Sequence, residues 1–154
     1  MQWEKLESSG KPPCARYQHS MHFYEKMNFL CIYGGKGETA ENEILNDLHL
    51  LRMDNLMWIK VKLRGMKLGG RANFASCFHL QSKARNDFNG APSHKLIIFG
   101  GIKENMSYSN DTFVLEFNQA KIREVVKKEK ELKERLKLEQ ELMLLEAKKQ
   151  FQEN

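Results

Sequence analysis

Two histidines, His19 and His22, have the spacing most suggestive of metal chemistry. Side chains three residues apart share a face of a helix, and the imidazole ring is an ordinary zinc ligand. Residues 17–22, however, have the composition of a β-strand, in which the two rings point to opposite faces. The other histidines are isolated in the sequence: His49, His79 and His94. We therefore expect structural histidines, no metal ligands and no catalytic histidine.

Residues 34–37, with the sequence Gly-Gly-Lys-Gly, superficially resemble a phosphate-binding loop. The spacing G-x-x-x-x-G-K-[ST] is absent, and no helix is predicted to follow. The chain also contains neither G-x-S-x-G nor H-E-x-x-H, the motifs of a nucleophilic serine and of a catalytic zinc. The sequence predicts no cofactor and no catalytic residues, hence a protein that is not an enzyme.

Composition and charge limit the class of protein further. Cys14, Cys31 and Cys77 form no Cys-x-x-Cys pair, which favours reduced thiols in a reducing compartment. The start of the chain has no secretory signal, and no run of about 18 apolar residues could span a membrane. The net charge of +5 is diffuse rather than gathered in a basic patch. We expect a cytoplasmic protein, with cytoskeletal association as an option and with neither nucleic acid nor membrane as partner.

The chain contains two copies of one pattern. Identical residues recur 55 positions apart at Trp3 and Trp58, at Gly10 and Gly65, and at Arg16 and Arg71. The pair Gly34–Gly35 recurs as Gly100–Gly101, and Asp47 recurs as Asp111, at slightly longer spacings. An insertion of about ten residues in the second copy, within 81–93, explains the difference. A period of about 50 residues with strand-like segments is typical of propeller blades.

The apolar segments of each copy have the length of strands. In the first copy they are residues 17–22, 28–33, 47–51 and 57–62, and in the second 72–80, 94–99 and 112–117. Ile122 stands where the second copy should have its tryptophan, so this copy lacks a fourth strand.

From about Asn118 the sequence becomes rich in Lys, Glu and Leu, with no Gly or Pro to the end. This composition predicts one long charged amphipathic helix or coiled coil. Its apolar positions form two offset stripes rather than one continuous heptad frame. We expect residues 119–153 to bind a helical partner or to self-associate.

The order of residues in the two copies resembles the kelch repeat. The first copy carries Arg16, His19, Gly34, Gly35, Asp47 and Trp58, and the second carries Arg71, Gly100, Gly101 and Asp111. The second copy departs from the pattern at Phe74, which replaces the histidine, and lacks the final tryptophan. The resemblance implies one four-stranded propeller blade per repeat and a function in binding other proteins.

The same residues have a physical reading as architecture. Paired glycines allow a backbone turn at positive φ and a close approach of neighbouring strands. A tryptophan in each repeat can pack between blades. We expect Arg16 and Asp47 to bond to the backbone or to one another inside the sheet.

The predicted fold is mainly β, with two antiparallel four-stranded kelch-type blades, the second incomplete, followed by one long α-helix. The domains are residues 1–117, with blades at about 16–62 and 71–117, and the helical residues 118–154. Trp3 belongs to a strand of a neighbouring or closing blade. Because closed propellers have about 4–8 blades, two blades leave open faces for another chain or the helix to cover.

The predicted function is that of a kelch-type adaptor or scaffold without enzymatic activity, which assembles through its helix. The loops at 36–46, 81–93 and 103–110 are candidate contact regions, because a rigid sheet would hold them. Two alternatives stay open, a truncated fragment of a larger kelch propeller and a propeller enzyme.

Overall fold

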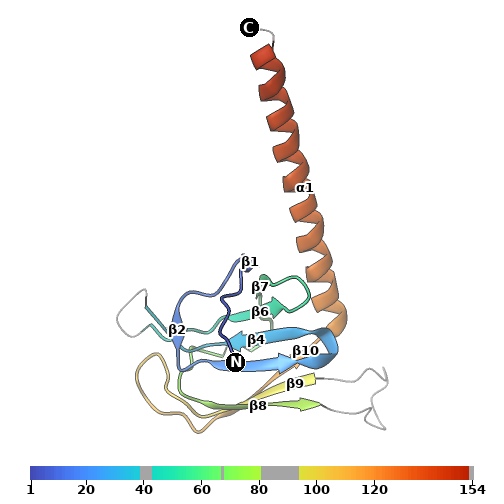
Figure 1. Cartoon of the computed structure of the whole chain (residues 1–154). Helices are drawn as coiled ribbons and strands as arrows, with labels where there is room; N and C mark the ends of the chain where they lie inside the picture. The colour runs from blue at the N-terminus through green and yellow to red at the C-terminus, as the bar shows by residue number, and fades with distance from the viewer. Residues whose placement is uncertain (39–42, 67, 81–93, 153–154) are drawn as a thin grey trace. The chain divides into compact units, whose positions relative to one another are not determined.

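The computed structural model describes residues 1–38, 43–66, 68–80 and 94–152. Its compact units are Met1–Phe117 and Asn118–Asn154. Antiparallel sheets build the first unit and one helix builds the second, as Figure 1 shows. The expected mainly-β fold with a long helix at its end is confirmed.

Blade one is a sheet with the strand order β1-β7-β6-β4-β3. Its strands are β1 (Ser9–Gly10), β3 (Ser20–Tyr24), β4 (Phe29–Tyr33), β6 (Leu48–Arg52) and β7 (Met57–Val61). The last four pair antiparallel, and β1 adds to the outer edge of β7 in parallel. A short 3₁₀ helix, η1 (Glu25–Met27), turns the chain from β3 into β4.

The first strand of blade one begins later than the sequence suggests. Gln18 has a φ of 56°, which interrupts the extended backbone between β2 (Arg16–Tyr17) and β3. The strand β2 pairs instead with β5 (Lys36–Gly37), which follows the first glycine pair. His19 therefore lies just outside the strand that contains His22.

Blade two consists of β8 (Ala75–Leu80), β9 (His94–Phe99) and β10 (Thr112–Phe117), in the order β10-β9-β8. The prediction that this blade is incomplete is confirmed, since β10 pairs with β9 alone among the described residues. The expected insertion at 81–93 lies outside the described residues.

The core lies between the two sheets. In blade one both faces of β4 and β6 are largely buried, and on the face toward blade two Cys31, Tyr33 and Leu50 are almost inaccessible. Blade two contributes Leu96 and Ile98 from its central strand. The inner strands β3 and β8 are in contact, so the two blades stand side by side. In β9 the buried residues alternate with more exposed ones, because residues two apart share one face of a sheet.

The helix α1 (Gln119–Gln152) begins after Asn118, whose Oδ1 accepts a hydrogen bond of 3.1 Å from the backbone N–H of Lys121. Ion pairs with i,i+4 spacing follow its surface, among them Lys128–Glu124 and Arg135–Glu139. None of the described helices is long and apolar enough to cross a membrane.

Trp3 differs from expectation, since it lies in no strand and its side chain is fully exposed. The only strand of the segment before β2 is β1, at the edge of β7. No strand edge among the described residues pairs with residues 1–8.

Candidate interaction surfaces

Backbone hydrogen bonds join the two blades where the chain passes from one to the other. The N–H of Gly35 donates to the carbonyl oxygen of Arg71 at 2.8 Å, and the N–H of Arg71 donates to that of Leu45 at 3.1 Å. The N–H of Asn73 donates to the carbonyl oxygen of Gln18 at 3.0 Å. These bonds fix blade two against blade one without relying on side-chain identity.

Aromatic side chains fill the junction between the blades. Tyr24 of β3 lies 4.5 Å from the ring centroid of His94 and 5.6 Å from that of Phe78. Phe117 closes the cluster at 5.3 Å from Phe78. Beside it, the Nε2 of His22 and the hydroxyl of Ser76 are hydrogen-bonded at 2.8 Å. This hydrogen bond gives His22 a structural contact across the junction.

Arg16 and Asp47 form an ion pair of 2.7 Å next to the first glycine pair, which confirms the expected bond. The Nη1 of Arg16, which bonds Oδ1 of Asp47, also donates to the carbonyl oxygen of Gly34 at 3.1 Å. The Nε2 of His49 lies 2.8 Å from Oδ2 of Asp47. The Arg16 side chain is only 3% exposed. Burial opposes ionisation of Asp47, but the hydrogen bonds from Arg16 and His49 prevail and hold its pKa well below the usual range.

The second copy repeats this pair in a looser form. Arg71 lies 3.4 Å from the carboxylate of Asp111, and its guanidinium sits 5.8 Å from the ring centroid of Phe113. The hydroxyl of Ser109 donates to the Asp111 carboxylate at 2.7 Å, and this bond, with Lys103 and Arg71, lowers the pKa of Asp111. Asp111 is exposed where Asp47 is not. In each copy the arginine near the start of the repeat is paired with the aspartate that directly precedes a strand, β6 in the first copy and β10 in the second.

The signature residues that remain are also placed by architecture. Gly34, Gly35, Gly100 and Gly101 all have positive φ, as paired glycines at the turns require. Trp58 is half-buried on β7 opposite Leu51, and His19 packs against Gly35. In the part of the chain that the structure describes, no group of three or more His, Cys, Asp or Glu side chains could hold a metal ion.

Substitution of Gly35 by Ala should destabilise the fold more than the same change at Gly65. Both glycines have φ above 90°, so both variants bear backbone strain of roughly 1–3 kcal/mol. A Cβ on Gly35 would also lie 2.7 Å from the carbonyl oxygen of Tyr17 and 2.8 Å from the Cβ of His19, whereas one on Gly65 meets nothing within 4 Å. Urea unfolding of the two variants measures the difference. Equal losses would contradict a close approach at Gly35.

Sequence reasoning missed several residues that matter here. His49, which looked isolated in the sequence, follows Asp47 by only two positions and hydrogen-bonds its carboxylate. That spacing was a usable signal. The contact of Tyr24 with Phe117 had no such signal, because it depends on how two sheets meet.

The loop at 103–110 is held in place, unlike a simple polar connection. The carboxylate of Glu104 accepts a 2.7 Å hydrogen bond from the N–H of Gly70, and Ile102 bridges to both Ala72 and Tyr108. Tyr108 is nevertheless 85% exposed. Of the other expected contact loops, 81–93 and part of 36–46 lie outside the described residues.

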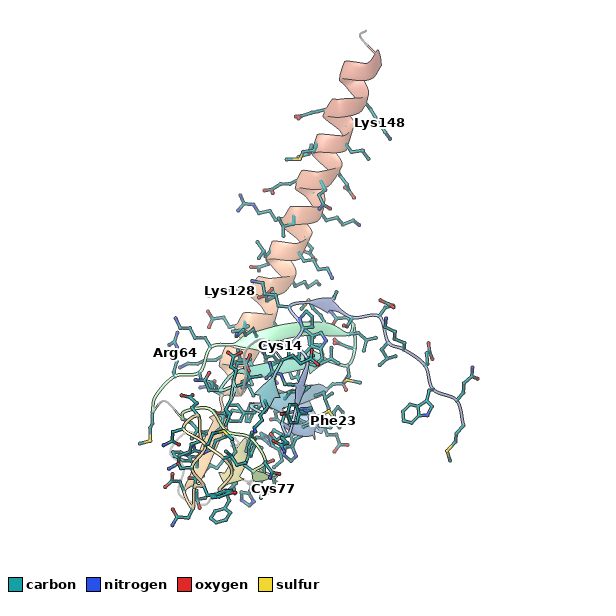
Figure 2. The ribbon with its side chains drawn as sticks, turned by 90° about the vertical axis from the view of Figure 1, so that its left-hand side faces the viewer. Cys14, Phe23, Arg64, Cys77, Lys128 and Lys148 are labelled. Atoms are coloured by element: carbon teal, nitrogen blue, oxygen red, sulfur yellow. The ribbon has the colours of Figure 1, made fainter. Side chains whose placement is uncertain are left out.

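Each blade also has an outward sheet face with exposed apolar side chains. The open face of blade one carries Met21 and Phe23, and the open face of blade two carries Cys77, Phe99 and Val114. One side chain from each of these faces, Phe23 and Cys77, is labelled in Figure 2. These side chains alternate with the buried ones on the same strands, so they belong to the far side of each sheet.

Stability should fall as the pH drops below about 6.5, because of histidines buried in the junction. Burial lowers the pKa of His94, aided by the charge of Lys26, and burial also lowers the pKa of His22. Neither ring nitrogen of His94 has a hydrogen-bond partner among the described residues. Below their ordinary pKa the unfolded chain takes up protons that the folded chain does not, so unfolding is favoured.

The variant His94→Phe should show a smaller loss of unfolding free energy between pH 7 and pH 5, measured by urea titration at each pH. His79→Phe, at an exposed position of the same blade, is the control and should keep the original slope. An unchanged slope in His94→Phe would refute the role of His94.

Comparisons with known proteins agree with this architecture. A family model described as the KLHDC2/KLHL20/DRC7 Kelch-repeats domain matches residues 1–135. Acyl-CoA-binding domain-containing protein 4 of Arabidopsis thaliana is 31% identical over 99 residues, which are 64% of this chain and 12% of that protein. Dynein regulatory complex subunit 7 of Chlamydomonas reinhardtii is 35% identical over 65 residues, or 42% of this chain and 5% of that protein. The chain thus spans 12% or less of the length of these two relatives.

Proposed function

Because the chain belongs to the KLHDC2/KLHL20/DRC7 Kelch-repeats domain family, we propose that it is a kelch-type adaptor or scaffold that binds proteins and assembles through α1. The observation that carries this proposal is the pair of blades joined by backbone bonds, which presents an anchored loop at Tyr108. Rigid sheets that hold exposed loops are suited to recognition rather than to covalent chemistry.

The same geometry supports a protein without enzymatic activity. The charged groups that sequence analysis singled out, Arg16, Asp47, Arg71 and Asp111, are paired with one another inside the blades. These ion pairs support a structural role for the four residues. We place the protein in the cytoplasm, where the three free thiols are stable, and expect a cytoskeletal setting because one relative is named as a dynein regulatory complex subunit.

The helix supports assembly through its apolar stripe. Leu138, Leu142 and Leu145 follow a 4-3 spacing and are each more than half exposed. Leucines in that pattern bury their side chains when a second helix packs along them. A partner helix, from another copy or from another protein, is the occupant that fits this spacing.

Sedimentation velocity of the full chain tests the assembly. The double variant Leu138→Glu/Leu142→Glu should weaken association at least tenfold. Leu144 lies outside the stripe, so Leu144→Glu should not weaken association. Affinity capture on the same variants tests the adaptor role, with Tyr108→Ala expected to lose a partner that Leu144→Glu keeps. A helix whose double variant associates like the wild type would sink helix-mediated assembly.

A further inference from the structure

The open faces of the two blades are made of positions that the junction already shows to be complementary. In the junction, β3 presents His22 and Tyr24 to blade two, and β8 presents Ser76 and Phe78 to blade one. The 55-residue offset between the copies places Met21 and Phe23 at the positions of Ser76 and Phe78. It likewise places Cys77 at the position of His22. Each open face is therefore the repeat counterpart of a face that is buried within the chain.

The central strands show the same relation. Tyr33 and Leu50, which are 1% and 2% exposed in the junction, correspond to Phe99 and Val114 of blade two. Phe99 and Val114 are 53% and 55% exposed. Blade two thus carries apolar side chains at positions that blade one buries against a neighbouring blade, and a solvated face gains nothing from them.

The outer edge of blade two lacks the strand that blade one has. In blade one β7 pairs with β6, but β10 has no partner on that side among the described residues. Residues 2–6 are the counterpart of β7 at the 55-residue offset, with Trp3 matching Trp58 and Lys5 matching Lys60. This segment lies in no strand and runs away from the sheets in Figure 2. Within the described part of the chain, the outer edge of β10 and the strand-like residues 2–6 are thus both without a partner strand.

We propose that a second copy of this chain covers these surfaces, head to tail. The open face of blade two of one copy packs on the open face of blade one of the next, and residues 2–6 of that next copy form the fourth strand beside β10. The two contacts fall in one place because residues 2–6 immediately precede blade one. Such an interface uses different patches on the two copies, and two to four copies would give a ring of about 4–8 blades.

The repeat also sets the register and the charge contacts of the donated strand. Trp58 lies opposite Leu51, so Trp3 lies opposite Leu115 of the other copy. Lys60 lies 3.6 Å from Asp47, so Lys5 of one copy approaches Asp111 of the other. In an unassociated copy this Asp111 is exposed. Glu4 replaces the buried Ile59, so Glu4→Ile is expected to tighten the association.

Complementation between two variants tests the proposal in a background with Leu138→Glu and Leu142→Glu, which separates it from assembly through the helix. Phe23→Glu and Val114→Glu should each be monomeric by sedimentation velocity at concentrations where the parent associates. Mixed in equal amounts they should form a dimer and nothing larger, because one intact interface remains. Met66→Glu, an exposed position off both faces, is the control and should associate like the parent.

A second measurement addresses the donated strand. Trp3→Ala should raise the dissociation constant at least tenfold, and Glu4→Ile should lower it. A monomeric parent, a mixture that stays monomeric, or a Trp3→Ala variant with the parent's affinity would each overturn the proposal. Failure of helix-mediated assembly would instead appear as an unchanged dissociation constant when the two helix substitutions are introduced alone.

Discussion

Tyr24→Ala should lower the free energy of unfolding by about 4 kcal/mol, the range in which buried aromatic residues fall when they are cut to alanine. Tyr24 is 2% exposed and touches three rings of blade two, those of Phe78, His94 and Phe117. The substitution leaves a cavity where one ring of blade one meets three rings of blade two. The blades should therefore lose their coupling as well as stability.

Phe23→Ala is the matched control, since Phe23 is the adjacent residue on β3 and faces away from the junction. In a single copy it is 53% exposed, so at concentrations below those at which copies associate its removal should cost no more than about 1 kcal/mol. Urea unfolding gives both free energies, and hydrogen exchange shows whether β8 to β10 lose protection before β4 and β6 in Tyr24→Ala. Similar losses at the two positions would show that the ring cluster does not hold the blades together.

The sequence predicted those features that depend on neighbours along the chain. Residues 94–99 and 112–117 form β9 and β10 with the expected bounds, because apolar alternation marks them clearly. Bonds of Arg16 and Asp47 to one another or to the backbone were expected, and Arg16 makes both, to Asp47 and to the carbonyl oxygen of Gly34. The late start of β3 could not be predicted from the sequence. It results from the positive φ of Gln18, and glutamine, unlike glycine, does not indicate a left-handed backbone.

The junction itself was beyond sequence reasoning. Tyr24 and Phe117 are 93 positions apart, and their contact depends on the angle and register at which two sheets meet. The missing fourth strand of blade two was predicted because Ile122 stands where the repeat would have a tryptophan. The interaction surfaces could be predicted only in part. Periodicity locates the open faces in the sequence, but the packed junction is needed to show which surface is complementary to such a face.

Asp47→Ala should cost about 3 kcal/mol, the lower end of the range for breaking a buried ion pair. The substitution leaves the guanidinium of Arg16, 3% exposed, without its carboxylate, and it also removes the acceptor that His49 uses. Asp111→Ala in the second copy is the internal control. It breaks the same contact at a longer distance and a more exposed carboxylate, so its loss should be clearly smaller.

The pH dependence distinguishes a lost ion pair from a general packing defect. The pKa of Asp47 is held well below the usual value of about 3.9, so its contribution to stability is present above that pH and is lost as the pH falls through the folded-state value. The gap in unfolding free energy between wild type and Asp47→Ala should therefore narrow as the pH is lowered below about 4. A packing defect would leave the gap constant with pH. Because Arg16 also bonds the carbonyl oxygen of Gly34, a narrowing gap would tie the glycine turn to the charge of a single carboxylate.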